Sequence, residues 1–417
     1  EDKSSYSKSN SRTDFYSLSG HIDWSHIFAD VHDVKVMVGS QYNLKEYEGT
    51  FLYTEGILPS LEIPNSTKDV VYLKNGDDKS TKWQEAVMSY FGRINYNYRS
   101  KYMLEAQGRY DGSSKFQPEN RWVFYWGTSA GWRISEEAFM KNLTFVDELK
   151  LRASYGSVGN QSGVDRYDGA QLYNFTPSGG ALIGNGKISY VDTNGKLPST
   201  DRTWERIHNY NIGLDFGFLD GRISGSIDVY KSKTNDMLLN RSLPYMTGFS
   251  EAKFNAGEVM NRGVELSLNT VNINGDGKDN FRWESGLTFY RNKNKIVHLF
   301  GKDANGKEAN DTGNATTNGY ETARALVIGE SINAAWDLKM LGIFQSQAEI
   351  DSYVDANGNK IQPDAVPGDI KFLDYNGDGK ISTDDRHCIG DMDPLFTINF
   401  SNTLSLSLIH ISEPTRP

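Results

Sequence analysis

The sequence has a single cysteine, no long apolar run and no excess of positive charge, and each shortage excludes a class of protein. One cysteine, Cys388, in 417 residues excludes an internal disulfide framework and any metal site built from several cysteines. No run approaches the ~18 apolar residues of a transmembrane helix, which excludes a helical membrane protein. Lys and Arg number 44 against 54 Asp and Glu, a net charge of -10, so nucleic acid is not an expected partner.

Local signatures of enzymes are missing as well. The chain has no GxSxG, HExxH or P-loop motif. His208, His298 and His387 lack the i, i+4 partner or carboxylate spacing of a metal or acid–base site. A hydrolase site of Ser, His and Asn or Asp on lipid-facing strands would be assembled only by folding, and no local motif supports one. We therefore predict that the protein is not an enzyme.

The chain begins without Met and without an apolar leader. Its first residues, EDKSSYSKSN, are already polar. A secreted or outer-membrane protein is expected to begin with a cleavable apolar segment. We expect either that this segment has been removed or that the sequence is an internal fragment.

What the chain does have is strict alternation of apolar and polar residues. In residues 89–134, two adjacent runs of period two are joined by a short polar break, which predicts an antiparallel hairpin. One face is rich in aromatic residues, with tyrosines near the ends of the runs, and the other carries charged residues in mid-strand. An outer-membrane β-barrel has this division, with lipid outside, a wet lumen inside and aromatic residues at both interfaces.

The same alternation returns along most of the chain. Further strands are predicted within residues 15–24, 34–42, 122–134, 149–155, 210–216, 223–229, 264–268 and 281–289, with a separate, less regular run near Phe51. Asp220-Gly221 is a strong signal for a tight turn. Residues 157–200 and 231–258 are predicted to be long loops. Short turns that alternate with long loops fit periplasmic turns and extracellular loops.

A soluble β-sandwich is the alternative fold, because its strands alternate too. Sandwich strands usually hide fewer tyrosines and carry fewer mid-strand charges. The predicted fold class is therefore all-β, an antiparallel transmembrane β-barrel with long extracellular loops.

One segment has the spacing of a calcium loop. In DYNGDGKISTDD, the oxygen ligands expected at positions 1, 3, 5, 7, 9 and 12 fall on Asp374, Asn376, Asp378, Lys380 (through its backbone carbonyl), Ser382 and Asp385. Gly379 occupies the position of the sharp turn. The departure is Asp in place of Glu at position 12, although dockerin-like calcium loops also use Asp there. We predict a structural calcium site; the alternative is a solvated turn that binds no ion.

Several segments resemble one family in the same order. They are YFGRINYNYRSKYMLEAQGRYDGSSKF, RWVFYWGTSAGWRISEEAFM, LKLRASYGSVGNQ, FNAGEVMNRGVELSL and PGDIKFLDYNGDGKISTDDRHCIGD. Together they are similar to the barrel of the SusC/RagA family of TonB-linked outer-membrane transporters of Bacteroidota, in register from about residue 80 to 404. The resemblance implies the outer membrane of a Gram-negative cell and a barrel of about 22 strands whose lumen is closed by a plug.

The resemblance also implies a function and partners. We expect uptake of large nutrients, foremost oligosaccharides and otherwise peptides, with a SusD-like lid lipoprotein above the barrel and TonB acting through an N-terminal part outside this sequence. The sequence shows no recognisable plug, TonB box or signal peptide and too few predicted strands to close such a barrel, so we expect an incomplete portion of the barrel that is not competent alone. An adhesin or a passive porin is the alternative.

The resemblance to the family also implies which residues face the lipid and which face the lumen. Outer-membrane lipid is expected on the aromatic face, with girdle residues Tyr90, Tyr98, Tyr102 and Tyr110. The lumen is expected on the other face, with Arg93, Glu105, Gln107 and Arg109. We assign residues 1–405 to the partial barrel, with 374–385 as a calcium-loop-like insert. Residues 406–417, which abandon the alternation, resemble translated sequencing adapter and are predicted to be non-native.

Overall fold

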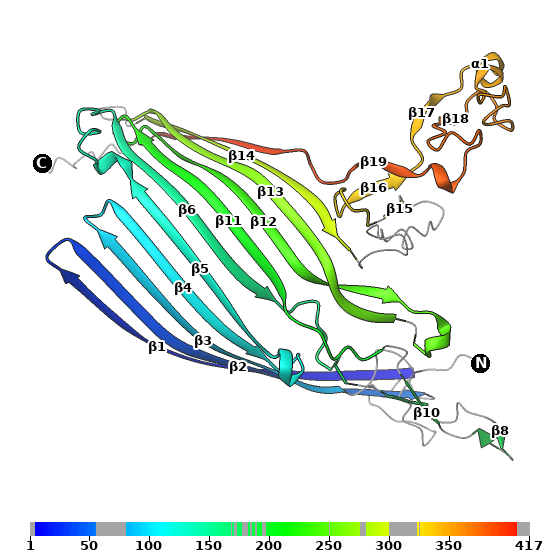
Figure 1. The fold of residues 1–417 in the computed structure, drawn as a ribbon, viewed down its shortest axis with the longest axis horizontal. Helices are drawn as coiled ribbons and strands as arrows, with labels where there is room; N and C mark the ends of the chain where they lie inside the picture. The colour runs from blue at the N-terminus through cyan, green and yellow to red at the C-terminus, as the bar shows by residue number, and fades with distance from the viewer. Residues whose placement is uncertain are drawn as a thin grey trace, which may run out of the picture.

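Eleven strands form one antiparallel sheet in which every hydrogen-bonded neighbour is the next long strand along the chain. The computed structural model describes residues 5–55, 81–167, 169–170, 173–176, 182–183, 186–187, 190–193, 197–249, 251–275, 281–299, 323–324 and 326–406. The long strands are β1 (Ser5–Phe28), β2 (His32–Glu55), β3 (Thr81–Tyr98), β4 (Tyr102–Ser113), β5 (Trp122–Arg133), β6 (Val146–Asn160), β11 (Glu205–Phe218), β12 (Ile223–Ser242), β13 (Glu251–Ile273), β14 (Phe281–His298) and β20 (Thr397–Leu406). Figure 1 shows them side by side as a curved, tilted wall.

The register gives the wall two chemically different faces. On one face, residues directly opposite each other across six neighbouring strands are apolar: Leu151, Leu214, Ile227, Leu266, Phe289 and Ile398. The adjacent residue of each strand belongs to a second row, whose members are also directly opposite one another and are mostly polar: Arg152, Gly213, Asp228, Glu265, Tyr290 and Thr397. Successive side chains of a strand point to opposite faces, so an apolar face and a polar face run the length of the wall.

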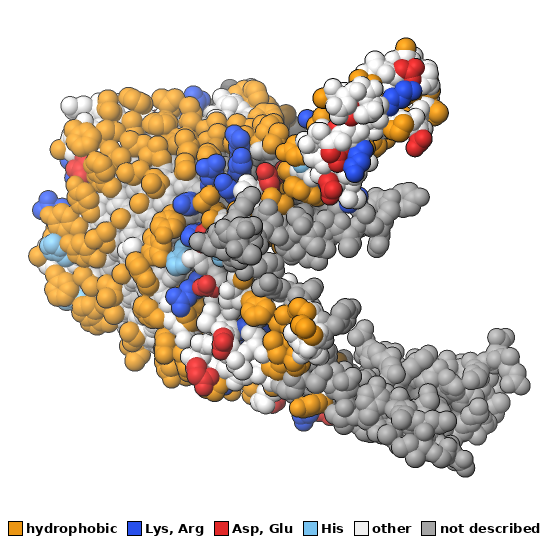
Figure 2. All heavy atoms as spheres, turned by 45° about the vertical axis from the view of Figure 1, so that its right-hand side comes forward, with side chains coloured by type: hydrophobic (Ala, Val, Ile, Leu, Met, Phe, Trp, Pro, Cys, Tyr) orange, Lys and Arg blue, Asp and Glu red, His pale blue; other side chains and the backbone are white. Residues whose placement is uncertain are grey.

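The apolar face is exposed rather than packed against a second layer. Leu18 is 74% exposed, Ile212 61% and Phe400 63%. Figure 2 shows hydrophobic side chains spread over broad areas of the wall. Soluble proteins rarely expose continuous apolar surface of this extent. Lipid is the environment that such a face requires, and the second sheet of a sandwich is missing from the described part of the chain.

Tight turns close one end of the wall. Ala29 and Asp30, Arg99 and Ser100, and Asp220 and Gly221 all have positive φ. Two consecutive positive φ values characterise the type I′ turn, whose twist matches that of the flanking strands. The Asp220-Gly221 turn is therefore confirmed. Long connections lie at the opposite end, after β2, β6 and β14.

Two predicted boundaries were wrong. Residues 231–258 do not form a long loop, since β12 continues to Ser242 and β13 already begins at Glu251. The run near residue 51 is not separate but belongs to β2. Both extensions lie beyond the apolar part of the strands, where neither face meets lipid and the alternation that marks a strand disappears.

Buried clusters lie at the end opposite the tight turns, where the strand ends meet the connections. One consists of Phe116, Val123, Tyr125, Val164 and Trp204, and a second of Val259, Ile296 and Leu299. Short elements lie in the connections at this end: β7 (Tyr173–Thr176) with β10 (Tyr190–Thr193), β8 (Leu182–Ile183) with β9 (Gly186–Lys187), and the 3-10 turns η2 (Pro118–Asn120) and η4 (Tyr245–Thr247). The 3-10 turn η3 (Ile134–Glu136) follows β5 at the tight-turn end.

Residues 326–396, here called the insert, stand apart from the wall between β14 and β20 (Figure 1). The insert contains β16 (Ala334–Asp337) paired with β19 (His387–Asp391), and β17 (Met340–Ile343) paired with β18 (Ile370–Phe372). β15 (Ala323–Arg324) pairs with β16. The helix α1 (Gln347–Ser352) and the 3-10 turn η5 (Thr383–Asp385) complete it. Within the described residues, no helix has the length and hydropathy to cross a membrane.

The predicted domain limits stay predictions. Residues 407–417, almost all of the predicted non-native tail, lie outside the described residues. The last described strand, β20, alternates regularly to Phe400, has the polar Asn402 on the same face before Leu404, and ends at Leu406.

Candidate functional site: the polar face and the acidic loop

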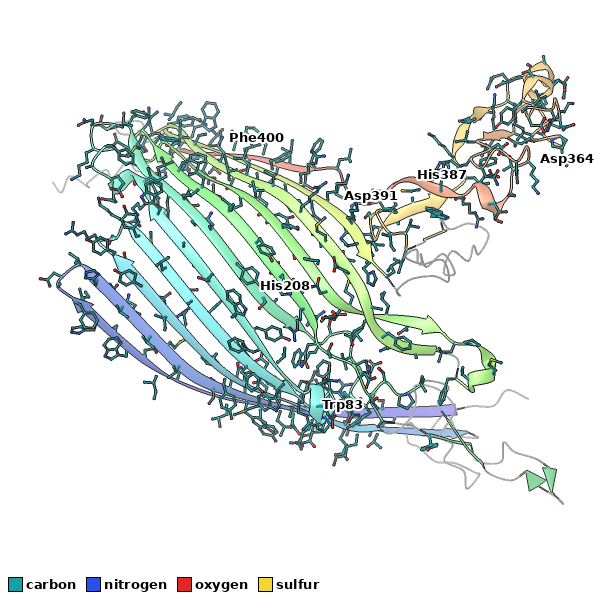
Figure 3. All side chains as sticks on the ribbon, in the orientation of Figure 1. Trp83, His208, Asp364, His387, Asp391 and Phe400 are labelled. Atoms are coloured by element: carbon teal, nitrogen blue, oxygen red, sulfur yellow. The ribbon has the colours of Figure 1, made fainter. Side chains whose placement is uncertain are left out.

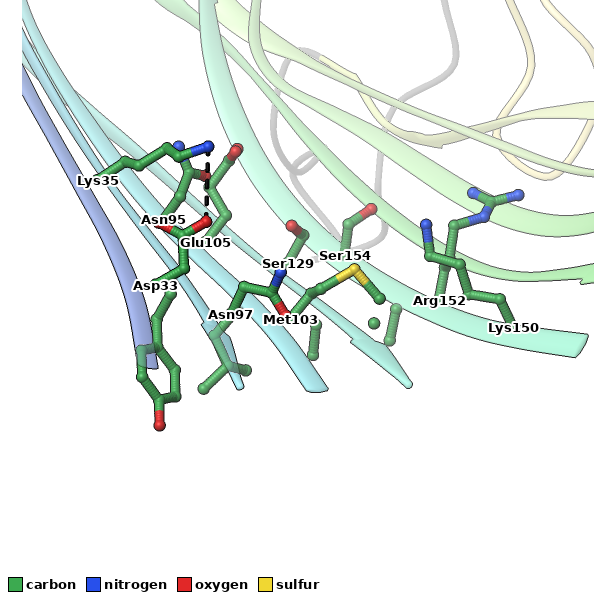
Figure 4. Close-up of a pocket in the computed structure, with 15 residues that line it drawn as sticks. Asp33, Lys35, Asn95, Asn97, Met103, Glu105, Ser129, Lys150, Arg152 and Ser154 are labelled. Carbon is green, nitrogen blue, oxygen red and sulfur yellow. Dashed lines mark ion pairs between the residues drawn. The ribbon is translucent and has the colours of Figure 1, made fainter. Parts of the chain in front are cut away.

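The polar face carries a groove of about 550 Å³ near the tight-turn end of the wall. Figure 4 shows its side chains projecting from neighbouring strands into the space that the wall curves around. Its lining includes several charged and amide groups: Asp33, Lys35, Asn95, Asn97, Glu105, Lys150 and Arg152. Lys35 Nζ lies 3.6 Å from Asp33 Oδ2. Such a surface offers both hydrogen-bond donors and acceptors to a polar ligand.

The four predicted lumen residues share this face. Glu105 lines the groove described above, whereas Arg93, Gln107 and Arg109 line a second groove of about 450 Å³. Arg109 donates to Asp111 Oδ1 at 2.7 Å and to the buried Ser89 hydroxyl at 2.8 Å. Arg109 is therefore fixed within the wall, and Arg93 is more exposed. That these side chains contact a solute in a lumen stays a prediction.

The four predicted girdle tyrosines lie on the apolar face in two groups at opposite ends of the β3–β4 hairpin. Tyr90 and Tyr110 both stack with Trp122, with ring centroids 6.1 and 5.0 Å apart. Tyr98 and Tyr102 stack at 6.3 Å near the tight turn. Two aromatic groups separated by apolar strand match the two interfaces of a membrane. Their role as a girdle stays a prediction.

Tyr102 is also tied to the connector that follows β5. Its hydroxyl donates to Glu137 Oε1 at 2.6 Å, and Trp132 Nε1 donates to the same oxygen at 3.2 Å. These hydrogen bonds lower the pKa of the Glu137 carboxyl group, and the bond from Tyr102 has the larger effect. An ionised Glu137 thus anchors the aromatic residues at this interface.

An ion-pair cluster beside the first groove, on the polar face near the tight-turn end, was not predicted. Arg152 on β6 donates to Asp215 on β11 through two nitrogens, at 2.8 and 2.7 Å, and to Asp228 on β12 at 3.2 Å. Gly213 lies between them, and a Cβ placed there would be 2.7 Å from Arg152 Nη2. The sequence showed all three charges in mid-strand, but only the register brings them together.

The histidines make aromatic contacts. Figure 3 shows His208 on the wall and His387 in the insert. His208 Nδ1 lies 2.9 Å from the Tyr155 hydroxyl on the apolar face. The His387 ring stacks on Tyr375 with centroids 4.0 Å apart. Both arrangements agree with packing roles.

The predicted calcium loop folds around its own acidic side chains. Carboxylate oxygens of Asp374, Asp378 and Asp385 lie within 4.8 Å of one another. Asp374 accepts from the backbone N–H groups of Gly377 and Gly379 at 2.8 and 2.9 Å. The side chains of Asn376 and Asp378 each accept from the N–H two residues on. The structure therefore brings three of the predicted ligands together at the spacing of an oxygen-rich site.

Asp385, the unusual residue at position 12, is fully buried. Burial raises the pKa of its carboxyl group, but N–H groups of Ser382, Asn376 and Tyr375 outweigh this effect and hold the pKa below its usual value. Ser382 and Asp385 also cap η5 reciprocally. A carboxylate has about four lone-pair sites, and the N–H groups use three of them. Asp385 keeps negative charge and acceptor capacity at the loop.

Two glycines allow this fold. Gly377 and Gly379 have φ values of +74° and +83°, where side chains are strained. A Cβ on Gly379 would also lie 2.8 Å from Asp355 Oδ2. Asp355 belongs to the neighbouring segment 355–360, which forms a turn through hydrogen bonds from the backbone N–H groups of Asn357 and Asn359 to Asp355 Oδ1.

Comparison with known proteins agrees with this architecture. The family model described as "TonB dependent receptor-like, beta-barrel" matches residues 2–377. The chain belongs to this family. It is a family of outer-membrane β-barrel receptors rather than of enzymes, so the predicted family, fold class, location and lack of enzymatic activity are confirmed.

Individual receptors are similar over much of the chain. The TonB-dependent receptor P26 of Formosa agariphila is 39% identical over 330 residues, which are 78% of this chain and 31% of that receptor. The TonB-dependent receptor SusC of Bacteroides thetaiotaomicron is 32% identical over 306 residues, 73% of this chain and 28% of SusC. The RagAB peptide importer in its "open-open" state matches with a TM-score of 0.74 at 22% identity, over 96% of this chain and 40% of the solved chain. The likeness to RagAB concerns the fold.

The receptor chain thus spans about a third of the curated relatives it matches. Its wall is part of a receptor barrel with lipid on the apolar face.

Proposed function

We propose that this chain forms part of the barrel of an energy-coupled outer-membrane transporter that imports a large polar nutrient. The observation that carries the proposal is the division of the wall into an apolar face and a continuous polar face within a TonB-dependent receptor family. The polar face supplies amide groups and paired charges, which suit hydrogen bonding to a hydrated solute. No step of the proposed transport breaks a covalent bond.

The substrate class that we propose is an oligosaccharide. SusC is a relative at 32% identity, and the wall offers the uncharged donors and acceptors of Asn95, Asn97 and Gln107. A peptide is the competing substrate, suggested by the name of the RagAB peptide importer. A SusD-like lid lipoprotein and TonB are the proposed partners of the whole protein.

Uptake by cells tests the proposal. A strain without the full-length gene should lose uptake of labelled oligosaccharide, and the restored gene should return it. Uptake that survives loss of TonB or dissipation of the proton gradient would indicate a passive porin. Binding at the cell surface without uptake would indicate an adhesin. Loss of peptide uptake alone would replace the oligosaccharide by a peptide.

We further propose that calcium stabilises the insert. Asp374, Asn376, Asp378, Lys380 through its carbonyl, Ser382 and Asp385 would be its ligands, as oxygen groups suit a hard cation. The proposal is supported by the convergence of three carboxylates around a turn that positive-φ glycines permit. In the full-length protein, a chelator should lower the melting temperature, and added Ca²⁺ should restore it. An unchanged melting temperature would refute calcium binding.

A further inference from the structure

A group of cations lies on the apolar side of the wall, where a barrel meets its membrane. The group, here called the basic patch, consists of Lys231 on β12, Arg262 on β13 and Arg291, Lys293 and Lys295 on β14. Lys231, Arg262 and Lys293 are directly opposite one another. They share a face with Val229, Val264 and Phe289, because residues two apart in a strand point the same way.

The basic patch lies at the extracellular interface. Lys231 is the ninth residue of β12, Arg262 the twelfth from the end of β13 and Lys293 the thirteenth of β14, each counted from the tight-turn end. A strand needs about 9–11 residues to cross a membrane. Short turns face the periplasm in such barrels. The cations therefore begin where the strands leave the outer leaflet.

All five side chains of the patch are exposed. The neighbouring Lys233 has a carboxylate partner, Glu258 Oε2 at 3.0 Å. Across the part of the chain that the structure describes, no carboxylate lies within 4.0 Å of a cation of the patch. Figure 2 shows Lys and Arg side chains gathered at the border of the hydrophobic area, near the insert.

The positive charge of the basic patch is confined to one side of the wall and does not recur on β1–β3. Beyond the apolar part of β1–β3, the same face carries Arg12, Asp14, Glu46, Glu48 and Lys82. Arg12 is paired with Asp14 at 2.9 Å. Cations without a nearby carboxylate thus distinguish β12–β14 from β1–β3. The basic patch does not result from a general excess of lysine on this face.

An apolar groove adjoins the patch. It has a volume of about 510 Å³ and is lined on the membrane side by Tyr155, Tyr210, Ile212 and Val229, with Ala130 and Ala153. Lys231 lies at its border. The small alanines leave room between the larger side chains, so the groove can take a hydrocarbon chain while its polar end reaches the cations.

We propose that the basic patch and this groove together bind a phosphorylated, multiply acylated glycolipid of the outer leaflet. The phosphate accepts charge-assisted hydrogen bonds from Arg262, Lys293 and Lys231. An acyl chain lies in the groove alongside Tyr155 and Tyr210, whose rings contact each other with centroids 5.0 Å apart. Binding of such a lipid would hold β12–β14 at a fixed depth in the membrane.

Lipid binding by the full-length receptor in phosphatidylcholine nanodiscs tests this assignment. The probe is fluorescent bis-phosphorylated lipid A, with its dephosphorylated form as comparison. Each cation near a charged membrane surface contributes about fivefold in affinity, so Arg262→Gln with Lys293→Gln should weaken binding about 30-fold. Arg12→Gln with Lys82→Gln removes the same residue types from the same face and should leave affinity within about twofold.

Each outcome supports or overturns the assignment. Equal loss in both double variants, or equal affinity for lipid A and its dephosphorylated form, would overturn it. Displacement of lipid A by millimolar inorganic phosphate would assign the patch to a free anion instead. Ala153→Trp fills the groove and should weaken lipid A binding while leaving the preference for phosphate. The comparison of the two lipids on the unaltered receptor decides the question even where a variant fails to fold.

Discussion

Replacing Arg152 by Met in the full-length receptor would remove the cation that joins β6 to β11 and β12. Arg152 makes a two-pronged contact with Asp215 and a third bond with Asp228. Their side chains are 34%, 28% and 17% exposed, so the cluster lies between a surface pair and a buried one. Surface pairs contribute about 0.2–1 kcal/mol and breaking a buried pair costs about 3–5 kcal/mol. We expect a loss of about 1–2 kcal/mol, discounted for solvent screening.

Urea unfolding in detergent, followed by tryptophan fluorescence, measures this loss. Arg93→Met is the matched control, because Arg93 is exposed on the same face and has no carboxylate within 4.0 Å in the described ranges. It should change the free energy of unfolding by less than about 0.5 kcal/mol. A double-mutant cycle with Asp215→Asn isolates the coupling. Equal effects of Arg152→Met and Arg93→Met would refute the proposed stabilising role of the cluster.

Three further predictions concern single positions. Gly213→Ala should push Arg152 Nη2 away from Asp228 while leaving the Nε bond to Asp215, costing about 0.5–1 kcal/mol in the same assay; no coupling between Gly213→Ala and Asp228→Asn would contradict this. Leu266→Arg, on the apolar face, should cost about 2–4 kcal/mol in lipid, whereas Ser267→Arg on the polar face should cost less than half as much; equal costs would contradict the facial assignment. Asp385→Asn should abolish stabilisation by Ca²⁺. Because the pKa of Asp385 is lowered in the fold, stabilisation by the ionised group should be complete above pH ~5 and lost as pH falls through the lowered pKa, below ~4. Loss of the Ca²⁺ effect already near pH 6 would contradict a lowered pKa of Asp385.

The lipid-facing strands could be predicted because lipid imposes a period of two. Ile227 and Val229 on β12 alternate with polar neighbours over the width of the membrane, and the structure pairs them with Leu266 and Val264 on the same apolar face. The period stops where the strands enter water, so the continuation of β12 to Ser242 could not be predicted.

Contacts between residues of different strands could not be predicted from the sequence either. Arg152 and Asp228 are 76 residues apart in sequence and meet only because Gly213 leaves room between β6 and β12. Lys231, Arg262 and Lys293 come together through register. The acidic loop was different, because its residues are contiguous and its glycines and spacing already define the turn.

The division of the wall into a lipid face and a polar face is tested most directly by fluorescence quenching at two adjacent residues of β12. Ile227→Cys and Ser226→Cys are made in full-length receptor carrying Cys388→Ser, labelled with a small fluorophore and reconstituted in brominated phospholipid. The structure places Ile227 among Leu214 and Leu266 on the apolar face and Ser226 on the opposite face. Strong quenching at position 227 and little at 226 is the predicted result. Equal quenching at both positions, or stronger quenching at 226, would contradict the account.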